Sequence, residues 1–114
     1  MSTDYVNYLL ELLAPMGDVR AKRMFGGHGI FRSDLMFGLV ADDTLYLKAD
    51  DSNRDDFTTL ELEPFVYLKK GKPFSLSYYQ APEDALEDSL LLCEWAEKSY
   101  AVAVQANANK RKRR

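Results

Sequence analysis

The single histidine of this sequence lies in the stretch whose residue types could best support chemistry. His28 stands among glycines in Gly26-Gly27-His28-Gly29, and exposed backbone N–H groups of a glycine-rich turn can hold an anion. However, the Gly-Lys-Ser or Gly-Lys-Thr of a phosphate loop does not follow, and the next residues predict a strand rather than a helix. We therefore interpret Gly26, Gly27 and Gly29 as a structural turn, a bulge or tight strand entry that uses the conformational freedom of glycine.

The single cysteine offers no stronger chemistry. We place Cys93 on the apolar face of a helix, where a thiol behaves as a small hydrophobic group. It has no cysteine partner for a disulfide, and nothing around it or His28 marks a nucleophile pair. The acidic residues do not follow the spacing of a calcium loop or of paired acid–base carboxylates. We expect no catalytic residues, no metal and no cofactor, and hence that the protein is not an enzyme.

Charge is unevenly distributed along the chain. The sequence holds 15 Lys and Arg against 18 Asp and Glu, and its last five residues are all basic: Lys110, Arg111, Lys112, Arg113 and Arg114. Without these five, 10 basic residues face 18 acidic ones, so the body carries −8 and the tail +5. A block of like charge favours a disordered tail that could contact nucleic-acid phosphates without reading sequence. The alternative is a frayed helix end whose cations complement the helix dipole.

The composition is that of one globular domain, with 46% hydrophobic and 29% charged residues. No apolar run approaches the roughly 20 residues of a membrane helix, and the N-terminus lacks the features of a signal peptide. We expect a cytoplasmic protein with no membrane contact. Residues 1–109 are predicted to form a single domain, and residues 110–114 a basic, disordered tail.

Hydrophobic spacing predicts the elements that position these residues. A helix with one apolar face precedes Pro15, and residues 19–23 are interpreted as a connector. Period-two segments and turn residues then predict a three-stranded meander from Ile30 to Lys48, a short helix after Asp50, and a hairpin over residues 65–79. With a long final helix from Ser89, the predicted fold is α+β, a five-stranded antiparallel sheet in the order α-β-β-β-α-β-β-α.

Two surfaces of these elements are candidates for binding. The final helix has a predicted core face that includes Leu90 and Val104, and a second apolar stripe, in which Leu91, Trp95 and Val102 could contact a protein partner or form a homodimer. The second candidate is an aromatic sheet face able to stack bases, formed by Tyr46, Tyr67, Tyr78 and Tyr79. The ribonucleoprotein sheet signature is absent, and we expect helices to cover part of that face.

Four stretches carry a resemblance to a known family. They are residues 23–30, RMFGGHGI; residues 35–48, LMFGLVADDTLYLK; and Lys70-Gly71-Lys72-Pro73, followed by Leu92-Cys93-Glu94-Trp95-Ala96 in the final helix. Together they resemble the TfoX N-terminal domain of the TfoX/Sxy competence regulators. The resemblance implies the same α+β order and no catalytic residues to carry over.

The resemblance also implies a function. Members of that family are regulators of bacterial competence genes, thought to act as coactivators beside the cAMP receptor protein through protein contacts. They carry a second, C-terminal domain that we do not find in this sequence. We therefore expect a small regulatory interaction module that contacts the transcription machinery. The alternative is weak, sequence-nonspecific nucleic-acid binding through the basic tail.

Overall fold

Helices pack beside a single antiparallel sheet. The computed structural model describes residues 3–24 and 26–112, without the side chains of residues 68, 69, 73–76, 111 and 112. The helices are α1 (Thr3–Leu13), α2 (Arg54–Thr58) and α3 (Ser89–Lys112), with 3-10 turns η1 (Ala14–Met16) and η2 (Glu83–Glu87). The strands are β1 (Val19–Met24), β2 (Gly27–Arg32), β3 (Leu35–Ala41), β4 (Thr44–Lys48), β5 (Pro64–Lys69) and β6 (Lys72–Gln80). The α+β class and the antiparallel sheet are confirmed.

The prediction of five strands is wrong, because the described residues form six in the order β1-β2-β3-β4-β6-β5. The additional strand is β1, which covers the predicted connector and pairs antiparallel with β2. Val19 and Ala21 pack against the core, whereas Arg20, Lys22 and Arg23 are exposed. Charged side chains are common on an edge strand, and here they concealed the strand's apolar alternation.

Tight turns connect the strands β2, β3 and β4 of the predicted meander. Ser33 and Asp34 have φ values of 50° and 65°, and Asp42 and Asp43 both have 55°. Two consecutive residues with positive φ give the turn twist that matches antiparallel strands, and Asp tolerates this conformation well. These turns place β2, β3 and β4 side by side in sequence order.

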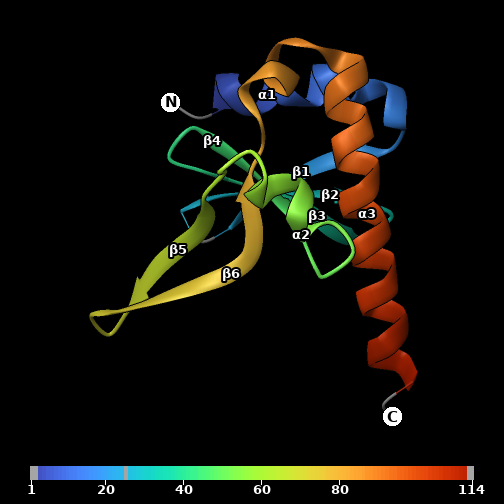
Figure 1. Cartoon of the computed structure of the whole chain (residues 1–114). Coiled ribbons are helices and arrows are strands. Elements are labelled where there is room, and N and C mark those ends of the chain that lie inside the picture. The colour runs from blue at the N-terminus through green and yellow to red at the C-terminus, as the bar shows by residue number, and fades with distance from the viewer. Residues whose placement is uncertain (1–2, 25, 113–114) are drawn as a thin grey trace.

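One face of the sheet packs against the helices. Ile30, Leu45 and Leu47 are fully buried there, together with Leu9 of α1 and Phe57 of α2. In Figure 1, α3 runs along one side of the sheet, α1 lies across one end, and the β5–β6 hairpin projects away from the helices. The core therefore lies between the sheet and its helices, and the hairpin extends beyond it.

The buried face of α3 differs from the predicted one. Leu90 is 75% exposed and Val104 is 43% exposed, although both were assigned to the core stripe. Ala96, also assigned to that stripe, is buried as predicted, and Leu92 and Ala103 are buried in place of the two exposed residues. Two apolar stripes satisfied the same period, so spacing alone did not decide which one faces the sheet.

The end of α3 lies inside the predicted tail. The helix continues through Lys112, so Lys110, Arg111 and Lys112 belong to it, and Lys110 is exposed. Lys and Arg are good helix formers, and cations are favourable at a helix C-terminus. The remaining tail residues, Arg113 and Arg114, lie outside the described residues. Over the described part of the chain, no helix is both long and apolar enough to span a membrane.

Candidate interaction surfaces

The three glycines around His28 meet different local demands. Gly26 has a φ of +76°, and a Cβ there would meet nothing within 4 Å. A Cβ on Gly27 would lie 2.1 Å from the backbone oxygen of Val40 on the neighbouring strand. Gly29 is buried beneath the side chains of three neighbours, Met24, Phe31 and Met36. The glycines thus allow a left-handed turn and a close approach of strands, which are packing roles.

His28 and Cys93, the two residues considered for acid–base or nucleophilic chemistry, are both partly buried in the fold. His28 lies half-buried on β2, paired in the sheet with Arg23 and Val40, and its Nδ1 has no hydrogen-bond partner. Burial raises the pKa of the Cys93 thiol, whose Sγ donates to the backbone oxygen of Leu12 at 3.5 Å. A raised pKa reduces the reactive thiolate at neutral pH. Within the described residues, no three His, Cys, Asp or Glu side chains gather as metal ligands.

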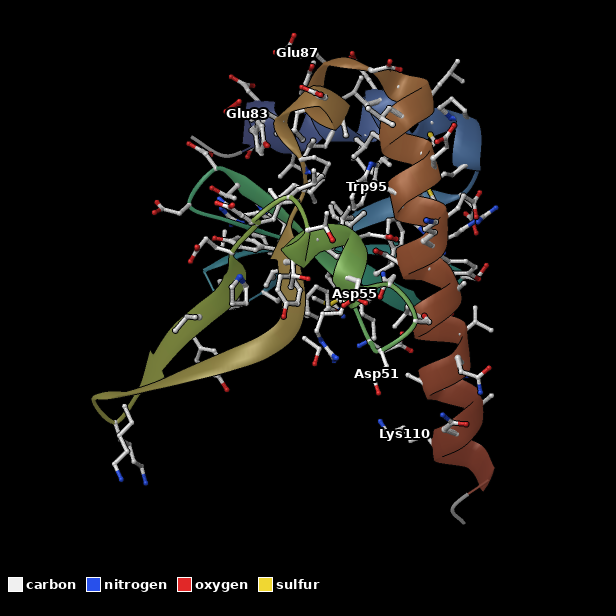
Figure 2. The ribbon with its side chains drawn as sticks, viewed as in Figure 1. Asp51, Asp55, Glu83, Glu87, Trp95 and Lys110 are labelled. Carbon is white, nitrogen blue, oxygen red and sulfur yellow. The ribbon has the colours of Figure 1, made fainter. Side chains whose placement is uncertain are left out.

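A groove of about 400 Å³ separates α2 from α3. Its lining residues are Asp55, Asp56, Thr59, Leu60, Glu94, Trp95 and Lys98. Lys98 crosses it to form a salt bridge with Asp56 at 3.0 Å, and Trp95 packs edge-on against Phe57 at 5.1 Å. Figure 2 shows Asp55 on α2 and Trp95 on the adjacent α3. The groove therefore combines an aromatic wall with an acidic rim.

A second groove, of about 530 Å³, lies on the other side of Leu60. Its apolar lining includes Leu60, Leu62 and Leu86, and its acidic residues are Asp43, Glu83 and Asp84. Burial and the nearby Asp43 carboxylate raise the pKa of Tyr5, which also lines this groove. The second groove thus repeats the composition of the first, with apolar walls and acidic residues.

Leu60 lines both grooves, and we call its side chain, which lies between them, the Leu60 ridge. Its side chain is 53% exposed, while the backbone N–H groups of Leu60 and Leu62 both donate to the Phe57 carbonyl at 3.1 Å. Glu61, between them, has a φ of 58° and donates to Thr58 at 2.9 Å. An exposed leucine on a backbone fixed by hydrogen bonds costs little entropy to dock, so the Leu60 side chain is preorganised for a contact.

The predicted partner stripe of α3 is only partly a surface. Leu91 and Trp95 are half-buried against the core, and Val102 is buried at 4% exposure. Of the three, Trp95 lines the α2–α3 groove. The sequence analysis did not identify Leu60 as a surface residue. The available signal was the alternation of Leu60 and Leu62 with Glu61 and Glu63.

The basic end of α3 borders a different groove, of about 300 Å³. Lys110 lines it with Lys48 and Tyr78, and the Lys48 Nζ lies 5.1 Å from the centroid of the Tyr78 ring. Burial lowers the pKa of Lys48 and raises the pKa of Tyr78 to about 12. In Figure 2, Lys110 lies at the opposite end of α3 from Glu83 and Glu87. The molecule therefore has an acidic end and a basic end along α3.

These features define the class of protein as a small α+β domain with three helices and a six-stranded antiparallel sheet over its described residues. The chain belongs to the TfoX N-terminal domain family, whose sequence model matches residues 11–103. This match confirms the family resemblance predicted from the glycine turn and the strands that follow it.

Several relatives are similar over most of this chain. Protein Sxy of Escherichia coli (strain K12) is 25% identical over 103 residues, which are 90% of this chain and 49% of the relative. The DNA transformation protein TfoX of Haemophilus influenzae is 35% identical over 91 residues, 79% of this chain and 41% of the relative. DNA transformation protein TfoX1 of Aliivibrio fischeri is 34% identical over 68 residues, 60% and 32% respectively. The chain thus spans half or less of the length of these relatives.

Proposed function

We propose that the protein is a regulatory docking domain in the control of DNA uptake, acting through protein–protein contacts at the Leu60 ridge. Its family membership supports the regulatory part, as do two relatives that carry the name DNA transformation protein. The proposal places the domain in the cytoplasm, where bacterial transcription takes place, with a component of the transcription machinery as its partner.

The observation that carries this proposal is the exposed Leu60 between two acid-rimmed grooves. Binding energy at protein interfaces concentrates in a few apolar or aromatic anchors, and the charged rim sets specificity and association rate. A partner segment with apolar side chains flanked by Lys or Arg would fit both the grooves and acids such as Asp55 and Glu83. Association should then weaken as salt concentration rises.

A homodimer through the α3 stripe has weaker support. Leu91 and Trp95 already pack half-buried against their own core, and Val102 is buried. Little of that stripe would be newly removed from water in a dimer, so its hydrophobic gain would be small. We therefore favour a different protein as the partner.

A chimera tests the regulatory role. This chain replaces the matching region of Haemophilus influenzae TfoX in cells that lack their own copy, and transformation frequency is measured. We expect the chimera to restore transformation and Leu60→Glu to lower it by at least about tenfold, since a charged anchor would be unpaired in the interface.

Leu90→Glu is the matched control, because Leu90 is a leucine with 75% exposure in the first turn of α3. It should leave the transformation frequency unchanged. Equal effects of the two substitutions, with both chimeras present at equal levels in the cell, would contradict docking at the Leu60 ridge.

Nucleic-acid binding through Lys110, Arg111, Lys112, Arg113 and Arg114 is a second candidate function. It is favoured by one observation: Lys110 borders the same groove as Lys48, which concentrates positive charge at that end. Removing residues 110–114 should then weaken retention on DNA and flatten its dependence on salt. Retention that keeps its strength and salt slope after the deletion would refute a role for the tail.

A further inference from the structure

The sheet has a second face, opposite the helix-packed core. In the β1–β2 register, Ala21 pairs with the buried core residue Ile30, so the alternating pairs Arg20–Phe31 and Lys22–Gly29 point to the opposite side. We call this side the open sheet face. It continues through residues that pair across the next strands: Leu39, Tyr46, Lys48, Tyr78 and Gln80. The helix-packed cluster of buried residues includes neither Leu39 nor Tyr78. At one end of the open sheet face, Lys48 and Tyr78 line a groove beside the last turns of α3.

Aromatic rings occupy the open sheet face. The ring of Tyr46 on β4 meets that of Phe65 on β5 at 5.1 Å, although β6 lies between these strands in the sheet. Phe65 in turn stacks on Tyr67 at 6.2 Å with an interplanar angle of 17°. All three side chains are partly exposed, whereas Leu39, which pairs with Tyr46 across β3 and β4, is buried. The result is a row of partly exposed rings beside a buried leucine.

Cations accompany these rings. Arg20 and Lys22 line a groove of about 470 Å³ with Phe31, and Lys48 lies over the Tyr78 ring. The ion pairs recorded among the described residues engage other cations: Arg32, Arg54 and Lys98. Two further exposed lysines, Lys70 and Lys72, lie at the β5–β6 turn, a short distance along the chain from Tyr67.

The acids near this face lie at its margins. Asp34 belongs to the β2–β3 turn and borders the groove that Arg20 and Lys22 line. Asp42 belongs to the β3–β4 turn, and burial together with the charge of the Asp42 carboxylate raises the pKa of Tyr46. Asp50 follows β4, and the charge of its carboxylate partly offsets the lowering of the Lys48 pKa by burial. The same carboxylate accepts hydrogen bonds from the Ser52 side chain and backbone. The strands between these margins present rings and cations.

We propose that the open sheet face binds single-stranded nucleic acid, with bases stacked on the Tyr46–Phe65–Tyr67 row and phosphates contacted by Arg20, Lys22 and Lys48. Unpaired bases expose faces that stack on aromatic side chains, and nearby cations track the backbone. A duplex hides those faces, so it gains only the phosphate contacts. A second copy of this chain would fit less well, because pairing the same face twice would bring like cations together.

This site differs from the docking function proposed above, because it lies on the other side of the sheet from Leu60. It shares only Lys48 with the groove that the tail residue Lys110 borders. The test therefore varies Tyr46, Arg20 and Lys22, which do not line that groove. The test uses the full chain and a fluorescent oligodeoxythymidine of about 15 nucleotides, long enough to cross one such face. Affinity is measured by fluorescence anisotropy at NaCl concentrations from about 50 to 200 mM.

Tyr46→Leu should weaken binding by about tenfold, since it removes a stacking ring and keeps apolar volume. Arg20→Gln and Lys22→Gln, at exposed positions, should each reduce the slope of log affinity against log salt by about 0.7. Tyr8→Leu is the aromatic control, because Tyr8 is 41% exposed on α1. It should leave affinity unchanged.

Three results would overturn the proposal. The first is no binding of the oligonucleotide at the lowest salt concentration. The second is binding that survives Tyr46→Leu, Arg20→Gln and Lys22→Gln unchanged, which would assign it to the tail. The third comes from sedimentation without nucleic acid: a dimer that Tyr46→Leu dissociates would identify the face as a protein interface. Equal thermal unfolding of the Arg20 and Lys22 variants and the unmodified chain confirms that these two test binding rather than folding.

Discussion

Gly26 and Gly27 are adjacent, but glycine is needed at each for a different physical reason. At Gly26 the backbone adopts a positive φ with open space around the missing side chain. At Gly27 the backbone is not left-handed, but the Val40 carbonyl occupies the position that a Cβ would need. Sequence reasoning identified both as structural, because glycines between apolar pairs indicate a bend or a close approach. The carbonyl contact depends on strand pairing, which local sequence does not specify.

Substituting each glycine by alanine separates these roles. Gly27→Ala should lower the free energy of unfolding by about 2–3 kcal/mol, because two strands must move apart to admit the methyl group. Gly26→Ala should cost about 1 kcal/mol, the strain of a left-handed alanine. Urea denaturation followed by circular dichroism measures both. A larger loss for Gly26→Ala than for Gly27→Ala would contradict the close approach seen at Val40.

Asp50 provides a pH-dependent contact at the start of the α2 segment. The Ser52 hydroxyl donates to its Oδ1 at 2.6 Å and the Ser52 backbone N–H at 2.8 Å, and the side-chain bond is the main reason that the pKa of Asp50 is lowered from 3.8. A lowered pKa in the folded state stabilises the fold above the unfolded value, and this stabilisation is lost as pH falls through the folded value.

Asp50→Asn should therefore lose less stability than the unmodified chain between about pH 5 and pH 2. Ser52→Ala should reduce the same pH dependence, because it removes the strongest donor to the carboxylate. Thermal unfolding at stepped pH measures the difference. An Asp50→Asn variant with an unchanged pH dependence would show that this carboxylate is not responsible.

At the scale of elements, sequence patterns predicted the features that depend on residues close together in the chain, such as turns and the start of a helix. The turns at residues 33–34 and 42–43 follow from residues that tolerate positive φ, and the start of α3 at Ser89 was correctly placed. Strand β1 was missed because its exposed Arg20, Lys22 and Arg23 outweighed the weak alternation of Val19 and Ala21. Only two residues separate β1 from its partner β2, but the glycines there were interpreted as a bulge or strand entry and not as the link between two paired strands.

The orientation of α3 makes a testable difference between two valines. Val102 is 4% exposed and Val104 is 43% exposed on the same helix. Val102→Ala should lower the free energy of unfolding by about 2 kcal/mol, through lost burial and the cavity that remains. Val104→Ala should change it by less than about 0.5 kcal/mol, as is usual at exposed positions. Equal costs, measured by urea denaturation, would mean that α3 is rotated from this arrangement.

At the scale of the whole molecule, the proposed function depends on surfaces assembled from distant segments. The two grooves beside the Leu60 ridge combine the turn after α2 with residues of η2, α3 and the β3–β4 turn. Sequence analysis proposed Trp95 as a contact residue and identified the uneven charge, but it could not place Glu83 or Asp43 in a groove with Leu60. Those neighbours are set by the sheet order and by the packing of α3, which are properties of the complete fold.

The most direct measurement of the central claim is site-specific photo-crosslinking in cells that carry the transformation chimera. A photoreactive residue is placed at position 60 in one strain and at position 90 in another, and both positions hold exposed leucines. Docking at the Leu60 ridge predicts a discrete crosslinked protein from position 60 that Asp55→Lys and Glu83→Lys together abolish, and none from position 90. No product from position 60, or the same products from both positions, would contradict it.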